Sequence, residues 1–556
     1  MPRSVSTRVR SPRSRTFRPV AGAVALALAL TAGSGAAASA TPAPDRGSAP
    51  AAAHPTLAGI DLERATIPDL QRAISSGRLS AVALTAFYLR RIRAVDPKLH
   101  SVITTNPAAL AEAAASDARR HRHGLRSPLE GMPVLLKDNV DTAGPQGSTA
   151  GSIALAATPP ARDAFLVRRL KAAGAVILGK TNLSEWANFR STASSSGWSG
   201  VGGQTNNPYV LDRNPCGSSS GSGAAISANL AVVAIGSETD GSIVCPSGQN
   251  GIVGIKPSLG LVSRGGVVPI SAQQDTAGPM ARHVIDAALT LSVIRGVDPA
   301  DPATAASRPV QHVDLTAGLR PGALRGKRIG LWLAGTGVEN VPEVGAITAA
   351  AVASLRRLGA TVVPADLPFQ DQIGTPEFNA LLVEFKHDLN AYLAARPGRH
   401  PRTLADLIAF DTAHADVEMP FFGQEIFEQA QATNGDLTDP AYLAQRHTAT
   451  SLAQRSIDET LATLHLDAIV APTNGPAWVT RLPGGDSFDQ FVASSTPAAV
   501  SGYASVAVPA GFDGQLPIGL SFIGARFSEA SLIRLAYAFE AGTQARRAPT
   551  FIPTIG

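Results

Sequence analysis

Two turns rich in glycine and serine frame one predicted helix and one predicted strand near the middle of the 556-residue chain. The first turn, residues 215–223, leads directly into an Ala-rich helical stretch and so exposes backbone N–H groups at a helix N-terminus. The second turn, residues 236–242, follows the apolar run 231–235. A flexible linker seldom leads straight into a helix and a buried strand, so we interpret the two turns as parts of one site.

Two other motifs are candidates for ligand binding, and we reject both. Residues 174–181 match a phosphate-loop pattern, but their central Ala-Val-Ile-Leu favours a buried strand over a backbone that curls around phosphates. His121 and His123 end a predicted helix with no further ligand nearby, which is typical of a solvated helix end. We therefore expect no metal site and no cofactor.

The two turns resemble the amidase signature family when they are taken together with a third segment, Leu-Leu-Lys-Asp-Asn at residues 135–139. The resemblance extends from about residue 58 to the C-terminus and is densest from 131 to 282. Within the family, several stretches look most like bacterial peptide amidases. These stretches are residues 179–190, 215–222, 238–246 and 422–425.

The resemblance implies a Ser-Ser-Lys triad in which Ser242 is the nucleophile, Ser218 the bridging serine and Lys137 the base. A serine hydroxyl is a poor nucleophile and must lose its proton as it attacks. Lys137 can take that proton only when neutral, which requires burial among apolar neighbours to lower its pKa. Ser218 would relay the proton because a hydroxyl both donates and accepts. Turn-forming serines and a surface lysine would explain each motif singly, but not the three together.

The turn that carries Ser242 is also expected to stabilise the tetrahedral intermediate through an oxyanion hole. The expected donors are the backbone N–H groups of Thr239, Asp240, Gly241 and Ser242. Ser219 is expected to orient the proton relay by hydrogen bonding.

Three further charged residues lie in family-like segments. Asp240 stands where the family usually has glycine, and a carboxylate close to Lys137 would favour the charged form of the lysine. We therefore expect the Asp240 side chain to point away from it. Lys180 and Lys256 have no relay serine beside them in the sequence, so we predict structural roles for both.

The resemblance implies hydrolysis of a primary carboxamide, such as the C-terminal amide of a peptide, to acid and ammonia without a cofactor. An amidase for aryl, fatty or small aliphatic amides remains an alternative, as does a catalytically inactive exported binding protein on an amidase scaffold. The amidotransferase subunit of the same fold, which acts on charged transfer RNA, is disfavoured by the predicted export. Four aromatic residues would either line an acyl groove or pack in the core, and we favour packing. They are Phe385, Tyr392, Phe421 and Phe422.

The elements that must position these segments alternate between strands and helices. A strand-like run at 133–137 precedes an amphipathic helix over 163–173 and a buried strand over 175–178, and the pattern recurs later in the chain. This alternation predicts an α/β fold, an α/β/α sandwich around a large mixed β-sheet. Residues from about 371 to 460 are predicted to form a mostly helical cap or flank.

The N-terminus has the pattern of a secretory signal peptide, residues 1–40. Six arginines and no acidic residue precede the apolar run Val20–Ala32, which is shorter than the roughly 20 residues of a membrane span. We expect cleavage near Ala40, a disordered linker over 41–57, a catalytic domain over 58–556, secretion, and no stable membrane association. Without the signal peptide the formal net charge changes from +5 to −1, which removes the compositional support for a nucleic-acid partner.

Only two cysteines occur, Cys216 and Cys245, so the protein has no disulfide framework. In an exported protein they would be able to pair. The alternative, which we favour, is two buried thiols that pack as small apolar side chains.

Overall fold

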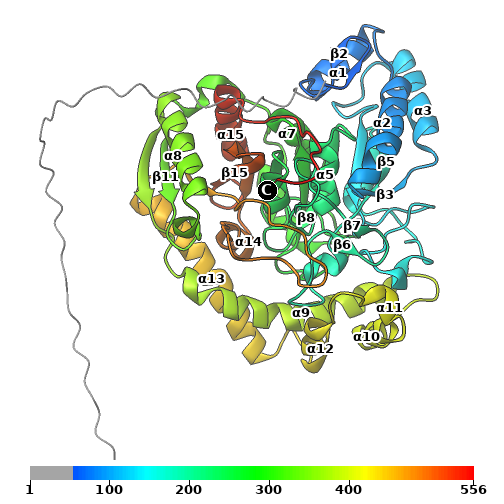
Figure 1. The fold of residues 1–556 in the computed structure, drawn as a ribbon, viewed down its shortest axis with the longest axis vertical. Coiled ribbons are helices and arrows are strands. Elements are labelled where there is room, and N and C mark those ends of the chain that lie inside the picture. The colour runs from blue at the N-terminus through cyan, green and yellow to red at the C-terminus, as the bar shows by residue number, and fades with distance from the viewer. Residues whose placement is uncertain (1–53, 556) are drawn as a thin grey trace, which may run out of the picture. The chain divides into compact units, whose positions relative to one another are not determined.

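An eleven-stranded mixed β-sheet forms the centre of the computed structural model, which describes residues 54–555 (Figure 1). The strand order is β12-β11-β13-β15-β14-β9-β10-β8-β4-β5-β3. In chain order the strands are β3 (Val102–Thr105), β4 (Pro133–Lys137), β5 (Val176–Thr181), β8 (Val233–Glu238), β9 (Val253–Lys256), β10 (Thr276–Ala281), β11 (Arg328–Trp332), β12 (Thr361–Ala365), β13 (Ala468–Pro472), β14 (Ser505–Asp513) and β15 (Leu516–Ile523). Two small hairpins lie outside this sheet and are formed by β1 (Thr56–Leu57) with β2 (Ile60–Asp61) and by β6 (Trp198–Ser199) with β7 (Gly203–Gln204).

Helices flank the sheet. They are α1 (Ile67–Ser75), α2 (Ala81–Val95), α3 (Ala109–His123), α4 (Phe165–Ala172), α5 (Ser220–Ser227), α6 (Val244–Gln249), α7 (Val284–Ile294), α8 (Pro342–Arg357), α9 (Gly374–Ala395), α10 (Leu404–Ala413), α11 (Ala415–Glu418), α12 (Glu425–Ala432), α13 (Pro440–Thr463), α14 (Thr496–Ser501) and α15 (Glu529–Thr543). Helices α8 and α15 pack on β14, α7 packs on β10, and α6 packs on β9, β14 and β15. The predicted α/β/α architecture around a large mixed sheet is confirmed.

Parallel pairing places the strands of the candidate site next to one another. Strand β4 runs parallel to both β5 and β8, with Leu136 opposite Ile235 of β8. All residues of these three strands are buried, as the continuous apolar runs of the sequence indicate. The phosphate-loop pattern at 174–181 lies largely in β5, so the prediction of a buried strand there is confirmed.

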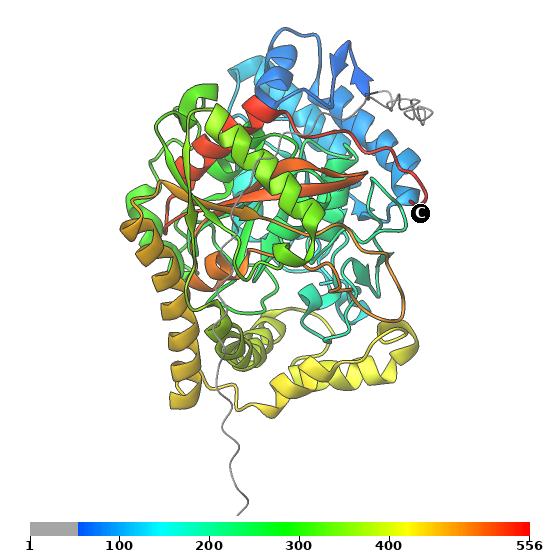
Figure 2. The ribbon, with the colours of Figure 1, turned by 60° about the vertical axis from the view of Figure 1, so that its left-hand side comes forward.

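The predicted helical flank is present as helices α9 to α13, which follow β12 and precede β13 in the chain. Figures 1 and 2 show them as a band along one border of the described unit. An apolar cluster joins this band to the segment that follows β5, through Phe385 and Phe427 on one side and Trp186 and Phe189 on the other. The flank therefore has a packed attachment to the catalytic part of the chain.

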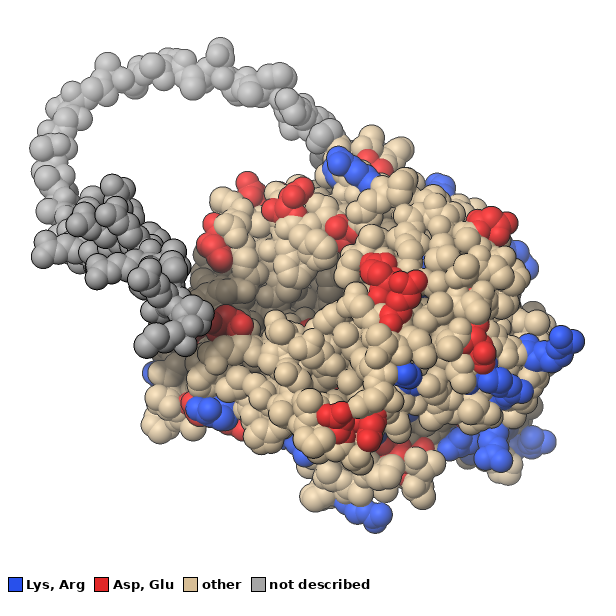
Figure 3. All heavy atoms as spheres, turned by 90° about the horizontal axis from the view of Figure 1, so that it is seen from below, with Lys and Arg blue, Asp and Glu red and all other residues tan. Residues whose placement is uncertain are grey.

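The predicted signal peptide 1–40 and most of the predicted linker 41–57 lie outside the described residues. The last two residues of that linker, Thr56 and Leu57, pair with Asp61 and Ile60. Among the described residues, no helix has the length and apolar composition needed to cross a membrane. Figure 3 shows one face of the molecule, which is hollowed and carries acidic side chains beside the hollow.

Candidate active site

Two parallel strands and one helix N-terminus bring the three sequence motifs together. Lys137 is the last residue of β4, and Ser237 and Glu238 end the neighbouring strand β8. Ser218 lies just before α5, whose residues pack against β4 and β8. The site is thus built where the carboxyl ends of two parallel strands meet a helix start, which is a common position for ligand sites in α/β folds.

Lys137 is fully buried and contacts two serine side chains. Its Nζ atom lies 2.7 Å from Ser218 Oγ, 2.9 Å from Ser237 Oγ and 3.3 Å from the Ser237 carbonyl oxygen. Burial lowers the pKa of Lys137 to about 7, against the opposing charges of Asp275 and Glu238. The lowered pKa favours the unprotonated form, which can accept a proton, far more than in a solvent-exposed lysine.

Ser219 fastens the first serine turn to the second. Its backbone N–H donates to the Ser242 carbonyl oxygen at 3.1 Å. Its hydroxyl donates to the Ser237 carbonyl oxygen at 3.0 Å and accepts from the Ser237 N–H at 3.2 Å. A Cβ at Gly236 would lie 2.8 Å from Ser219 Oγ, so this close approach requires glycine.

Ser242 lies in a turn that Glu238 holds from inside the protein. The Glu238 carboxylate accepts hydrogen bonds from the N–H groups of Ile243 at 2.7 Å and Val244 at 3.0 Å, at the start of α6. Gly241 has φ +78°, a conformation that favours glycine. Within residues 54–555 the N–H groups of residues 240–242 donate to no protein acceptor, so these donors remain available to a ligand.

The structure places Ser242 beside the contact between Lys137 and Ser218, without a direct hydrogen bond from the Ser242 hydroxyl to either residue among those described. Its side chain is 8% exposed, and no hydroxyl contact between Ser242 and Ser218 occurs among the described residues. The two residues are connected through the backbone contact of Ser219. Hydrogen bonds between catalytic groups are often long before substrate binds.

Asp240 turns its carboxylate toward α14, as expected. Its Oδ2 accepts a hydrogen bond from Thr496 Oγ1 at 2.6 Å. Burial raises the pKa of Asp240. The charges that act on Lys137 come from Asp275 and Glu238 instead.

Two polar residues beside Lys137 were not singled out from the sequence. The Asn139 side chain donates through Nδ2 to Ser237 Oγ at 2.8 Å, and Ser237 Oγ in turn lies beside Lys137 Nζ. Both residues belong to the motif segments, at 135–139 and 236–242. Their contact depends on the register of β4 against β8, which the motifs do not specify.

Cys216 and Cys245 form a disulfide bond, so the favoured interpretation as two free thiols is wrong. Their Cα atoms are 6.0 Å apart although 29 residues separate them in sequence. The bond joins a residue just before Ser218 to a residue just after Ser242. The sequence motifs place the two turns in one site, but they do not give the distance between the two Cα atoms, on which a disulfide depends.

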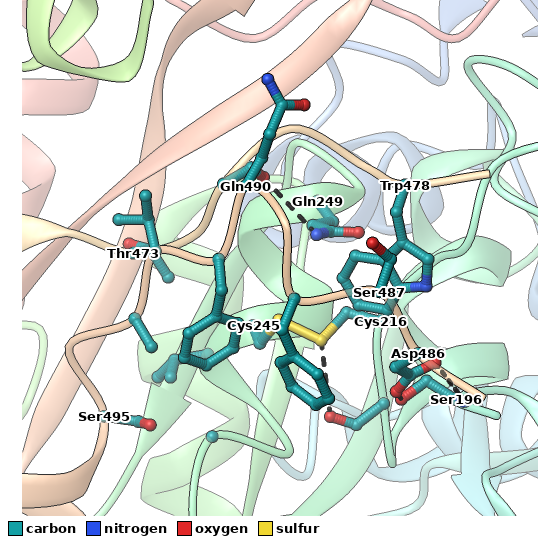
Figure 4. Close-up of a pocket in the computed structure, with 18 of the residues that line it drawn as sticks. Ser196, Cys216, Cys245, Gln249, Thr473, Trp478, Asp486, Ser487, Gln490 and Ser495 are labelled. Carbon is teal, nitrogen blue, oxygen red and sulfur yellow. Dashed lines mark hydrogen bonds between the residues drawn. A yellow bond between two sulfur atoms is a disulfide. The ribbon is translucent and has the colours of Figure 1, made fainter. Parts of the chain in front are cut away.

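A cavity of about 240 Å³ opens beside the two turns (Figure 4). One wall consists of the disulfide together with Gly217, Asp240, Gly241 and Val244. The opposite wall comes from residues 473–495, between β13 and α14, and includes Trp478, Phe488 and Phe491. The cavity therefore combines the two serine turns with a segment that is far from them in sequence.

The four aromatic residues considered for an acyl groove do not line this cavity. Phe385 is fully buried and packs on Phe427, and Phe421 and Phe422 pack on Trp198. Tyr392 donates from its hydroxyl to Asp141 at 2.8 Å. The favoured interpretation, packing within the protein, agrees with these contacts.

A model of the Amidase family matches residues 83–533. The chain belongs to the amidase family. A probable amidase of Arabidopsis thaliana is 42% identical over 501 residues, which cover 88% of this chain and 92% of the relative. One subunit of the glutamyl-tRNA(Gln) amidotransferase of Moorella thermoacetica is 36% identical and is matched over 98% of its length and 88% of this chain.

Solved structures of amidases show the same fold. The native peptide amidase from Stenotrophomonas maltophilia is 52% identical, with a TM-score of 0.83 over 88% of this chain and 99% of that chain. The same similarity, with a TM-score of 0.84, holds for the peptide amidase in complex with the competitive inhibitor chymostatin. The resemblance to amidase signature enzymes, and to peptide amidases among them, is confirmed, and the chain is an amidase that hydrolyses carbon–nitrogen bonds.

Proposed function

We propose that this protein is a secreted amidohydrolase that converts the C-terminal carboxamides of peptides to acid and ammonia through Ser242, Ser218 and Lys137. The observation that carries this proposal is the buried contact of 2.7 Å between Lys137 Nζ and Ser218 Oγ. A lysine that faces hydroxyl groups in a buried site, and whose pKa is about 7, is suited to act as a base at neutral pH.

In the proposed reaction, neutral Lys137 takes the proton of Ser218, and Ser218 takes the proton of Ser242 as Ser242 Oγ attacks the amide carbon. The carbonyl oxygen becomes an oxyanion, which the free N–H groups of residues 240–242 stabilise by roughly 3 kcal/mol for each good donor. When the intermediate collapses, the relay returns the proton to the departing nitrogen and ammonia leaves. Water then attacks the acyl-enzyme, gives up a proton to the same relay and releases the carboxylic acid.

The substrate class rests on similarity and on the shape of the site. The solved peptide amidase is 52% identical, whereas the amidotransferase subunit of Moorella thermoacetica is 36% identical. The cavity lies on one side of the serine turns and is large enough for an amino acid side chain and part of a backbone. Ammonia, as the leaving group, needs little space on the other side.

Incubation of a short peptide amide with the purified protein tests the activity. Mass spectrometry should show a gain of about one mass unit as the amide becomes an acid, and an enzymatic assay should detect ammonia. Ser242→Ala should abolish both signals without loss of the folded structure, and a fluorophosphonate should label the wild type only. Internal cleavage at a comparable rate, or rapid anilide hydrolysis without ammonia release, would contradict the proposed substrate class.

Secretion is proposed because residues 1–40 have the sequence pattern of a signal peptide, and it is tested separately from the activity. N-terminal sequencing of protein recovered from the medium should begin near Thr41. A cell-associated protein that retains residues 1–40 would contradict the proposal.

A further inference from the structure

The outer wall of the cavity is a loop, residues 474–493, that is anchored at several points. An isolated β-bridge pairs Asn474 with Ala493 and so closes the base of the loop. Further along, the Asp486 carboxylate accepts hydrogen bonds from the Ser196 N–H at 2.9 Å and from Ser196 Oγ at 2.6 Å. The Ala493 N–H also donates to the Thr336 carbonyl oxygen at 3.0 Å, and the Asn214 N–H donates to the Trp478 carbonyl oxygen at 2.8 Å, so the loop is bound to the rest of the protein at several positions and is not a free flap.

Two aromatic rings project from this anchored loop into solvent at the cavity. Phe488 is 63% exposed and Phe491 is 50% exposed, and their ring centroids are 5.3 Å apart in an edge-to-face arrangement. The other large apolar side chains exposed among the described residues belong to separate segments. They are Leu110, Leu125, Val417 and Leu443. A paired aromatic surface beside a cavity is typical of a binding site, because its hydration is unfavourable until a ligand covers it.

The ionisable side chains that line the cavity are acidic. Asp240 and Asp486 contribute carboxylates to the lining, and no Lys or Arg belongs to it within residues 54–555. Burial raises the pKa of Asp486 to about 6, while the two hydrogen bonds from Ser196 favour the ionised carboxylate. A negatively charged ligand would lose hydration in this cavity without gaining a cationic partner.

We propose that the loop 474–493 selects the C-terminal residue of a peptide amide, in that Phe488 and Phe491 bind an apolar side chain while the carboxylates of the wall exclude acidic groups. The same charge would distinguish the amide from its product. A peptide that ends in a free carboxylate carries a negative charge where the amide is neutral. The N–H donors of residues 240–242 can bind one of its oxygens, but no Lys or Arg lines the cavity within residues 54–555 to pair with the charge. The inference rests on the proposed peptide-amide activity and adds which kind of C-terminal substrate residue the enzyme recognises.

The first experiment compares kcat/KM for ammonia release from N-acetyl amides of phenylalanine, glycine and glutamate. The wild type should prefer the phenylalanine amide over the glutamate amide by at least about tenfold, a typical discrimination for an apolar pocket. The double variant Phe488→Ala/Phe491→Ala should lose at least about fivefold on the phenylalanine amide and less than about twofold on the glycine amide. Leu443→Ala on α13, an apolar residue outside the cavity that is as exposed as Phe491, serves as the matched control and should change neither value.

The second experiment measures binding to the Ser242→Ala protein by calorimetry. N-acetylphenylalaninamide should bind at least about tenfold more tightly than N-acetylphenylalanine, and Asp486→Asn should narrow this difference. Equal binding of amide and acid, or an unchanged phenylalanine-to-glycine ratio in the aromatic double variant, would overturn the inference. If the wild type releases no ammonia from any of the three amides, the proposed function itself fails, so the two failures are distinguishable.

Discussion

Lys137 and Lys180 occupy similar positions but have different surroundings. Each lies in one of two neighbouring parallel strands, β4 and β5, and each is fully buried. Lys180 Nζ donates to the carbonyl oxygens of Val140 and Gly147 and to Ser148 Oγ, and forms an ion pair with Asp138 at 3.7 Å. Burial lowers the pKa of both lysines, to about 7 for Lys137 and to about 8 for Lys180.

The difference lies in what the partner atoms can do. Carbonyl and carboxylate oxygens only accept hydrogen bonds, so the carbonyls of Val140 and Gly147 and the nearby Asp138 carboxylate favour the charged ammonium group of Lys180. The Ser148 hydroxyl already donates its own proton to the Val140 carbonyl oxygen. The nearest partners of Lys137 are the hydroxyls of Ser218 and Ser237, which can donate as well as accept. A neutral lysine can therefore satisfy its surroundings at the end of β4, whereas at β5 it would leave acceptors unpaired. Burial lowers the pKa of both lysines, so we attribute their different expected roles to the different atoms that contact them.

The largest expected contrast comes from replacing each lysine by methionine. Lys137→Met should reduce kcat by at least about a thousandfold with little change in the unfolding temperature, since the proton acceptor is lost. Lys180→Met should instead reduce the free energy of unfolding by about 3 kcal/mol or more, because Asp138 loses its buried partner. Steady-state kinetics and thermal unfolding of both variants test this. Equal losses of kcat in the folded proteins would remove the distinction between the two lysines.

The pH dependence of activity tests the same distinction on the unmodified protein. Because the lowered pKa of Lys137 is about 7, its neutral form increases as the pH rises through 7 and is lost below it. We expect kcat/KM to fall about tenfold for each pH unit below 7 and to level off above it. A pH–rate profile on a peptide amide measures this, and a maximum at acid pH would exclude Lys137 as the base.

Replacement of Ser237 should reduce the rate less than replacement of Lys137, and it should do so by changing the pKa of Lys137. In Ser237→Ala the charged form of Lys137 loses a hydroxyl acceptor, so the pKa of the lysine should fall further and the acid limb of the profile should move to lower pH. We expect kcat to fall by about tenfold, and Ser237→Thr, which keeps the hydroxyl, to restore most of it. A loss of rate with an unmoved limb would indicate a merely structural role.

Asn139 should give the smallest change, because it contacts Lys137 only through Ser237. Asn139→Ala should lower kcat by about twofold to fivefold and move the acid limb to higher pH, opposite to Ser237→Ala, because Ser237 Oγ without the Asn139 donor accepts more strongly from the charged form of Lys137. The double variant should show no additional shift, since both substitutions act on one hydrogen-bonded chain. Additive shifts in the pH–rate profile would show that Asn139 acts independently.

The fold was largely predictable because its signals are local. Continuous apolar runs such as 133–137 and 231–235 indicate buried strands, and the Gly/Ser turns mark their ends, so the α/β class and the three motif segments follow from short stretches of sequence. The Cys216–Cys245 bond depends on the distance between the two turns, and the contact of Ser237 with Lys137 depends on the register of β8 against β4. Both are set by tertiary pairing, which short stretches of sequence do not show. The loop 474–493 carries no helix or strand pattern, so nothing local assigned Phe488 or Phe491 to the cavity.

Two segments that are distant in sequence carry the groups assigned to catalysis and the loop proposed for substrate selection, and this separation has an evolutionary consequence. The groups assigned to bond breaking come from residues 137–242, whereas the loop across the cavity comes from residues 474–493, which make no contact with Lys137 within hydrogen-bond distance. Mutations in that loop can therefore accumulate after gene duplication without disturbing the lysine or its serines. Descendants of one ancestral hydrolase would then differ in substrate specificity while keeping the same catalytic chemistry. Exchange of the loop 474–493 between relatives would reproduce such a change of specificity in a single step.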